Sequence, residues 1–244
     1  MALLEIAEVS VQFGGLLAVD DASLSVPEGC VTGLIGPNGA GKTTLFNVIT
    51  GLQTPTRGRV MLDGNDVTRR RPYRRARAGI ARTFQRLEAF GSLTARDNVL
   101  VALEMRRRWA TKRYDAGSIA DEILARVGIS RVADTRVEAL PTGSARLVEL
   151  ARALATDPKV LLLDEPSSGL DEQETDALGT LLHELTAGGL AVLLVEHDMP
   201  LVMEACSYIS VLDFGRVIAR GTPAEIQADP SVQRAYLGTA KSAS

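Results

Sequence analysis

The sequence has few cysteines, no long apolar run and little net charge, and each of these features excludes a class of protein. Its two cysteines, Cys30 and Cys206, lie in apolar segments without CxxC spacing. Such isolated cysteines are typical of inert buried thiols in a reducing cytosol rather than of a disulfide framework. The longest apolar runs, VLLLD and LAVLLVE, fall far short of the roughly 20 residues that cross a bilayer, so we expect no membrane span. The N-terminus lacks the basic and apolar regions of a secretory signal, and a formal net charge of −3 gives no reason to expect nucleic acid as a partner.

Short apolar runs that precede helical patterns predict the fold class. VTGLIG, VLLLDEP and LAVLLVEH each stand before such a pattern, and continuously apolar strands alternating with helices indicate a parallel sheet covered on both faces. Near the N-terminus, LLEIAEVSVQF, VDDASLSVPEG and GRVMLDGNDV alternate between apolar and polar residues, which predicts an added antiparallel layer. Only helical patterns occur from residue 87 to 156. We therefore expect a helical insert at 87–156 that divides a nucleotide-binding core of residues 1–86 and 157–244.

The segment GPNGAGKTT follows an apolar strand and opens a helix, which is the context that a phosphate-binding P-loop requires. Its glycines let backbone N–H groups surround phosphate oxygens, Lys42 brings a positive charge to the terminal phosphates, and Thr43 offers a hydroxyl to Mg²⁺. Together with the strand and helix patterns above, this segment predicts an α/β fold with a P-loop NTPase RecA-like core, an N-terminal antiparallel β layer and an inserted α-helical subdomain. The nucleotide-binding residues predicted here are Gly36, Pro37, Asn38, Gly39, Ala40, Gly41, Lys42, Thr43 and Thr44.

Acidic residues after a second buried strand supply the other half of the predicted site. In KVLLLDEPSSGLD, the strand delivers Asp164 to the carboxyl edge of the sheet, where it would hold Mg²⁺ through water. Glu165 is placed to accept a proton from, or to orient, the attacking water. Without a P-loop upstream, the same pair would more often be a solvated strand end.

Two further polar residues are candidates for the same site. His197 ends the strand LAVLLVEH, where it could hydrogen-bond a γ-phosphate or hold the water against Glu165. Gln85, at the junction between core and insert, could ligate Mg²⁺ and sense the γ-phosphate. Taken alone, a single histidine or a glutamine at a domain junction is more often structural.

Together these motifs resemble the ATP-binding subunit of an ABC transporter, and the resemblance covers nearly the whole chain. It implies ATP and Mg²⁺ as cofactors, with Lys42, Glu165 and His197 in catalysis. It also implies that Phe13 stacks on adenine; the alternative is a strand residue packed in the core. The matching segments are Walker A at Gly36 to Thr43, the Q-loop Gln85, a signature near Leu140 to Ser144, Walker B at Leu161 to Asp164, Glu165, the D-loop at Ser168 to Asp171, and the switch His197.

The resemblance also implies partners and a location. Two ATPase subunits, identical or different, would meet head to tail, and separate transmembrane permease subunits would dock near Gln85 and the insert, at the cytoplasmic face of the membrane. GIARTFQ, LTARDNVLVA, VEHDM and the tail FGRVIARGTPAEIQADPSVQRAYLG resemble the ATPases of branched-chain amino acid importers, which work with a solute-binding protein. The lipopolysaccharide-exporter ATPase shares much of this pattern. A soluble ABC ATPase acting on DNA or ribosomes is a weaker alternative, because the chain has neither a coiled-coil or zinc-bearing insertion nor a tandem second unit.

The signature departs from the family's usual Leu-Ser-Gly-Gly-Gln. This chain has Leu140, Pro141, Thr142, Gly143 and Ser144, and Pro141 supplies neither the hydroxyl nor the N–H of the usual serine. The donors left for a phosphate are the Gly143 and Ser144 N–H groups, the Thr142 and Ser144 hydroxyls and the positive end of the helix. Either these groups take over phosphate binding, or the dimer is asymmetric and hydrolysis is weakened at the partner's ATP site.

Two clusters of basic residues lie outside the predicted ATP site. Most such runs are solvated helix faces, and the alternative is contact with acidic loops or anionic headgroups. The clusters are Arg69, Arg70, Arg71, Arg74, Arg75 and Arg77, and, around Trp109, Arg106, Arg107, Arg108, Lys112 and Arg113.

Overall fold

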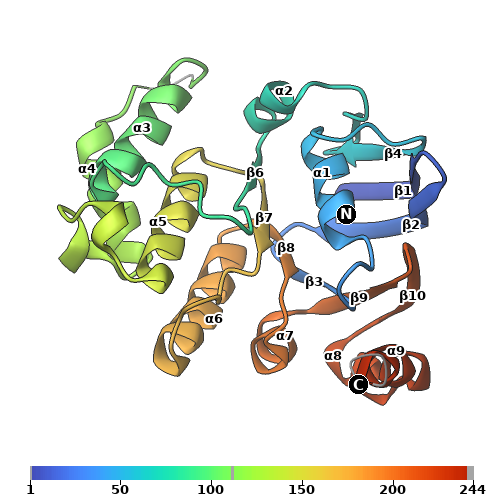
Figure 1. Ribbon diagram of the computed structural model, residues 1–244. Coiled ribbons are helices and arrows are strands. Elements are labelled where there is room, and N and C mark those ends of the chain that lie inside the picture. The colour runs from blue at the N-terminus through green and yellow to red at the C-terminus, as the bar shows by residue number, and fades with distance from the viewer. Residues whose placement is uncertain (1, 111–112, 241–244) are drawn as a thin grey trace.

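The computed structural model describes residues 2–110 and 113–240, and it contains two β-sheets with helices between and around them (Figure 1). The antiparallel sheet has the order β2 (Leu16–Pro27), β1 (Ala2–Phe13), β4 (Arg57–Leu62) and β5 (Asn65–Asp66). The second sheet has the order β10 (Arg216–Gly221), β9 (Tyr208–Asp213), β3 (Val31–Ile35), β8 (Ala191–Val195), β7 (Val160–Asp164) and β6 (Ile80–Arg82). Its strands are parallel except β10, which is antiparallel to β9. The predicted parallel core and added antiparallel layer are both confirmed.

Strands β7 and β8 are apolar up to their ends because each of their two faces is covered. Successive residues of β7 belong to two different cores: Val160 and Leu162 face one, and Leu161 and Leu163 face the other. The first core is shared with the antiparallel sheet and with α1 (Lys42–Thr50), which contributes Phe46. The second core is shared with α6 (Glu172–Ala187), α7 (Met199–Ala205) and the helices described next. A strand buried on both faces carries no polar residue until its end, and that end is where Asp164 lies.

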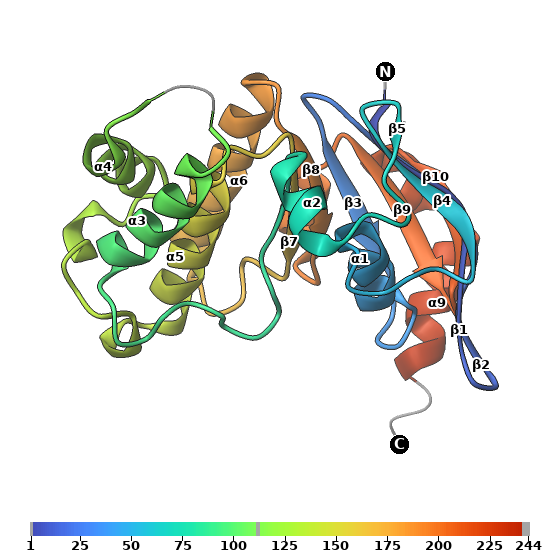
Figure 2. The same ribbon diagram turned by 90° about the horizontal axis from the view of Figure 1, so that it is seen from above.

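Residues 87–156 are helical, as predicted. They form α3 (Ala95–Arg107), α4 (Ala116–Arg126), α5 (Thr142–Ala155) and the 3₁₀ turns Ser130–Val132 and Val137–Ala139. The side chain of Thr94 caps α3, and that of Asp115 caps α4. Figures 1 and 2 show these helices on the side of the parallel sheet away from the antiparallel sheet. The division of the chain into a core of 1–86 and 157–244 and an insert of 87–156 stays a prediction.

Three short or terminal helices complete the described chain: α2 (Pro72–Arg77) before β6, and α8 (Pro223–Ala228) and α9 (Pro230–Ala240) after β10. None of the described helices is both long and apolar enough to cross a membrane. Cys206 is buried, and this burial raises the pKa of its thiol to about 12. The prediction of a buried thiol is wrong for Cys30, which is partly exposed because it lies in the turn before β3.

One member of the first basic cluster is not a solvated charge. Arg75 is 1% exposed and donates hydrogen bonds of 2.6 to 3.0 Å to four backbone carbonyls, two of them at the end of α1. Its burial lowers the pKa of the guanidinium to about 10. The arginine therefore fastens α2 to α1, which the charge pattern alone did not predict. Lys112, in the second cluster, lies outside the described residues.

Candidate nucleotide-binding site

The P-loop between β3 and α1 is held so tightly that two of its positions accept only glycine. Gly36 has φ +152°, and a Cβ there would lie 2.0 Å from the Leu212 carbonyl oxygen on β9. Gly41 has φ +107°, and a Cβ there would lie 2.6 Å from the Ala18 carbonyl oxygen on β2. Because the loop is wedged between β9 and β2, its backbone is fixed before any ligand enters, which is what a phosphate cradle requires.

Lys42 begins α1 and is held inside the loop. Its ammonium is buried and donates to the carbonyls of Gly36 at 2.6 Å and Pro37 at 3.0 Å. Burial lowers the pKa of Lys42, and the negative charges of Glu165 and Asp164 oppose this shift. A desolvated cation at the start of a helix is a strong attractor for an anion.

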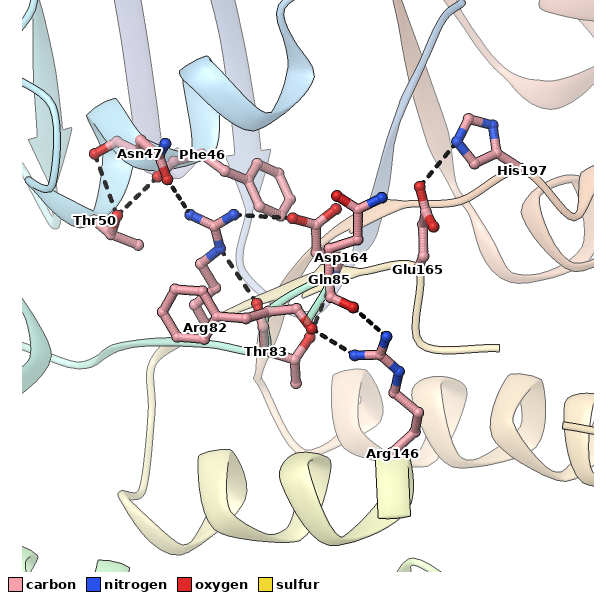
Figure 3. A network of polar contacts seen from close by, with 11 residues as sticks. Phe46, Asn47, Thr50, Arg82, Thr83, Gln85, Arg146, Asp164, Glu165 and His197 are labelled. Atoms are coloured by element: carbon pink, nitrogen blue, oxygen red, sulfur yellow. Dashed lines mark hydrogen bonds and ion pairs between the residues drawn. The ribbon is translucent and has the colours of Figure 1, made fainter. Parts of the chain in front are cut away.

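Asp164, at the end of β7, is held by a buried cation that the sequence did not predict. Arg82 Nη2 donates to Asp164 Oδ2 at 2.9 Å, and each of these two side chains is 5% exposed. The Arg82 Nη1 donates to Asn47 Oδ1 at 2.6 Å, and the guanidinium lies 5.1 Å and 4.9 Å from the ring centres of Phe46 and Phe84 (Figure 3). Burial lowers the pKa of Arg82, and its hydrogen bond to Asp164 opposes the shift. The Asp164 carboxylate is thus fixed in direction.

Glu165 and His197 come together as their positions after neighbouring strands predict. His197 Nε2 lies 3.0 Å from Glu165 Oε1 (Figure 3). Glu165 has φ +53° and donates its N–H to the Val195 carbonyl at 2.8 Å, so the backbone turns sharply to aim this carboxylate. A histidine paired with a partly exposed carboxylate at a strand end is an arrangement that can orient a water and accept its proton.

Glu196 is a further acid that sequence reasoning missed. It is 3% exposed, and its carboxylate accepts the N–H groups of Ser167 at 2.8 Å, His197 at 2.8 Å and Asp198 at 3.3 Å. It therefore joins the loop after β7 to the loop after β8. An acidic residue between an apolar strand and a histidine was the available signal, but its role depends on the distant Ser167.

Gln85 lies in an exposed loop that is hydrogen-bonded to side chains of α5. Arg146 donates to the Gln85 carbonyl and, at 2.6 Å, to the Phe84 carbonyl. Glu149, which is buried, accepts the Glu88 N–H at 2.5 Å, and burial raises the pKa of Glu149. The loop that carries Gln85 is thereby connected to the helix that begins at the signature.

Most of the predicted residues line one cleft of about 580 Å³, a size typical of small-molecule sites. Gly36 and Pro37 are not among the described residues that line it. The predicted residues that line the cleft are Phe13, Asn38, Gly39, Ala40, Gly41, Lys42, Thr43, Thr44, Gln85, Asp164, Glu165 and His197.

Comparison with known proteins decides the family. A family model described as ABC transporter matches residues 19–168, which is more than half of the chain. The chain belongs to the ABC transporter ATP-binding family. Members of this family hydrolyse ATP. A second model, described as branched-chain amino acid ATP-binding cassette transporter, matches residues 216–242.

Individual relatives refine this assignment. The chain is 39% identical to the high-affinity branched-chain amino acid transport ATP-binding protein BraF of Pseudomonas aeruginosa over 98% of both chains. It is 34% identical, also over 98% of both chains, to the lipopolysaccharide export system ATP-binding protein LptB of Haemophilus influenzae. It is therefore closely related to the importer ATPases, and the exporter ATPase is a weaker match.

Solved structures confirm the fold. A nucleotide-free ATP-binding cassette from an ABC transporter superposes with a TM-score of 0.87 at 32% identity, covering 97% of this chain and 99% of that chain. A dimeric cassette in a post-hydrolysis state, bound to ADP and Pi, superposes with a TM-score of 0.81 at 26% identity, covering 90% of this chain and 98% of that chain.

The predicted signature lies at the start of α5, and Thr142, Gly143 and Ser144 are not among the described residues that line the cleft of the same chain. Pro141 is the N-cap and provides no side-chain hydrogen bond to the described helix. Thr142 is exposed, whereas Gly143 is buried so closely that a Cβ would lie 2.5 Å from the Gly169 carbonyl oxygen of the D-loop. The first intrahelical bond runs from Ala145 N–H to the Pro141 carbonyl, so the three preceding N–H groups point out of the helix end.

The cleft of this ABC ATPase offers oxygen atoms that could bind a metal ion. The described residues contain no cluster of three or more His, Cys, Asp or Glu suited to a metal ion. Thr43, Gln85 and Asp164 line the same cleft and offer hydroxyl, amide and carboxylate oxygens, the donor types that Mg²⁺ prefers. Because Arg82 binds Oδ2 of Asp164, Oδ1 is the oxygen left to face an ion. These residues fit Mg²⁺ bound together with nucleotide phosphates.

Proposed function

We propose that this ABC ATPase supplies the energy for an importer of branched-chain amino acids or similar small polar solutes. The observation that carries this proposal is the match of residues 216–242 to the branched-chain amino acid transporter model, since the ATPase motifs themselves are common to many transporters. The 39% identity to BraF supports the same assignment. Export of lipopolysaccharide is the second candidate, favoured by the 34% identity to LptB.

In the proposed reaction, the triphosphate of ATP lies in the P-loop with its terminal phosphates against Lys42. Glu165 orients the attacking water and accepts its proton, and His197, 3.0 Å from Glu165, holds that carboxylate and water in place. Thr43, Gln85 and Asp164 would hold Mg²⁺, which supplies positive charge to the phosphates when bound. Phe13, half exposed at the cleft edge, would stack on adenine.

The permease subunits would bind in an apolar groove of about 400 Å³ between α2, α3 and the Gln85 loop. Exposed apolar side chains line it: Tyr73 of α2, Met105 of α3, Phe84 beside Gln85, and Leu52 from the segment after α1. Because Phe84 is adjacent to Gln85, a permease helix in the groove would touch the loop that senses the nucleotide. This contact would place the subunit at the cytoplasmic face of the membrane.

A second ATPase subunit would complete each nucleotide site in a head-to-tail dimer. This chain would present Thr142, Gly143 and Ser144 to the partner's ATP, with Pro141 in place of the usual hydroxyl donor. Each charge-assisted hydrogen bond that is lost contributes about 1.5–3 kcal/mol. We therefore propose that the partner's site hydrolyses ATP more slowly than the site formed by Lys42 and Glu165.

Transport by the purified complex tests the proposed substrate. The chain is isolated with the membrane subunits that accompany it and reconstituted in liposomes with its solute-binding protein. Leucine, isoleucine or valine should stimulate ATP hydrolysis and accumulate in the vesicles, and Glu165→Gln should abolish accumulation. Isolation of the chain with lipopolysaccharide-binding membrane subunits, or hydrolysis that does not respond to these amino acids, would contradict the importer assignment.

The asymmetry has its own test. Glu165→Gln in this chain is compared with the equivalent Glu→Gln in the partner ATPase. The first variant should lose most of the ATPase activity, and the second much less. Equal losses would show that the Pro141 signature is fully competent.

A further inference from the structure

Phe214 is the most exposed large apolar side chain among the described residues, at 88% exposure. Phe214 and Gly215 form the two-residue turn between β9 and β10, and both have positive φ, +42° and +81°. A turn of this kind favours Asn-Gly, because a bulky side chain is strained in the left-handed region. A strained and exposed phenylalanine contributes nothing to the stability of the hairpin, so its presence points to a function.

The turn is fastened directly to the nucleotide site. Gly215 donates its N–H to the carbonyl of Ala40 in the P-loop at 2.9 Å, and its own carbonyl accepts the Asp20 N–H at 2.8 Å. Arg216 adds a hydrogen bond of 2.7 Å to the Asp20 carboxylate. The turn therefore cannot move independently of the P-loop, and the position of Phe214 relative to bound phosphates is fixed by the backbone.

Phe214 lines the same cleft as the P-loop and Asp164. Phe13, Leu16 and Leu17, which are 48%, 67% and 43% exposed, line it as well. The lining thus combines Lys42 and the carboxylates with four exposed apolar side chains. A nucleoside triphosphate likewise combines charged phosphates with a base, and bases bind aromatic side chains through their flat faces.

We propose that Phe214 is a base-contacting residue of the ATP site, which forms with Phe13 a receptacle of two aromatic side chains for the adenine. The proposal rests on the nucleotide site proposed above. Two aromatic contacts favour a large purine over a smaller pyrimidine, so Phe214 contributes to the choice of nucleotide as well as to affinity.

The variant Phe214→Asn separates the base contact from the fold. Asparagine is favoured at this position of the turn, so the full-length variant should unfold at the same temperature or higher. Binding of ATP, UTP and magnesium tripolyphosphate is measured by equilibrium titration. We expect ATP binding to weaken about 5- to 20-fold, in the lower part of the range for one aromatic contact to a base. Tripolyphosphate binding should be unchanged, the preference for ATP over UTP should shrink, and Phe214→Trp should restore ATP affinity.

Two controls separate the possible failures. Ile218→Asn changes an exposed apolar residue of the same hairpin that is not among the described residues lining the cleft, and it should leave ATP affinity unchanged. Lys42→Ala should abolish binding of both ATP and tripolyphosphate; if it does not, the proposed nucleotide site itself is wrong. If Lys42→Ala behaves as expected, the Phe214 proposal is overturned by unchanged ATP affinity in Phe214→Asn. It is overturned equally by a parallel loss of tripolyphosphate affinity, which would indicate a distorted P-loop.

Discussion

Replacement of Arg82 by methionine should destabilise the protein far more than the loss of a surface ion pair. Arg82 and Asp164 are each only 5% exposed, so the variant leaves a carboxylate buried beside an apolar side chain. Removing one partner of a buried ion pair lowers the free energy of unfolding by about 3–5 kcal/mol. The variant also removes the hydrogen bond to Asn47 and the contacts of the guanidinium with two aromatic rings.

Chemical denaturation followed by circular dichroism measures this effect, and a double-mutant cycle identifies its origin. Asp164→Asn in the Arg82→Met background should recover part of the lost stability, because no buried charge remains. The matched control is Arg96→Met, which breaks a 2.6 Å ion pair with Asp121 whose side chains are 33% and 59% exposed. This control should lower the stability far less. Equal losses in Arg82→Met and Arg96→Met, or strictly additive effects in the cycle, would refute the reasoning.

Three further outcomes follow from the described contacts. Glu196→Gln should lower the ATPase kcat about 10-fold or more while KM for ATP changes little. The reason is that the amide has one acceptor oxygen fewer for the backbone N–H groups beside His197. An unchanged kcat in steady-state assays would contradict this positioning role. Gly36→Ala should lower the free energy of unfolding by about 1–3 kcal/mol in a denaturant titration and abolish nucleotide binding, because the alanine Cβ would lie 2.0 Å from a carbonyl oxygen. A variant with near-native stability and nucleotide affinity would show that the loop adapts. Cys206 should resist alkylation by iodoacetamide from pH 8 to pH 10, because a thiol pKa of about 12 leaves almost no thiolate. If mass spectrometry finds Cys206 alkylated as fast as Cys30, its burial is disproved.

Contiguous motifs carried most of what the sequence could predict. The P-loop, the strand that ends at Asp164 and the helical pattern of 87–156 are each defined by neighbouring residues, so local spacing was sufficient. The pairing of His197 with Glu165 followed from a second rule, that neighbouring parallel strands present their ends at one edge of the sheet.

The missed residues act across long separations in the chain. Arg82 reaches Asp164 because β6 pairs with β7, and that pairing has no local signal. Arg75 belongs to an arginine-rich run, and only the packing of α2 against α1 shows that it is buried. Phe214 stands in a two-residue turn, and its proposed role depends on a hydrogen bond between the turn and the P-loop.

The rate of ATP hydrolysis by the purified transporter containing the Glu165→Gln variant tests most directly whether this chain is the catalytic subunit. Replacement of a general base lowers turnover by roughly 10²–10⁴-fold. We predict a loss of this size at the Glu165 site, so that only the slower hydrolysis at the partner's site remains, with ATP affinity retained because Lys42 and the P-loop still bind the phosphates. Hydrolysis at the wild-type rate would show that Glu165 and His197 do not carry out the reaction.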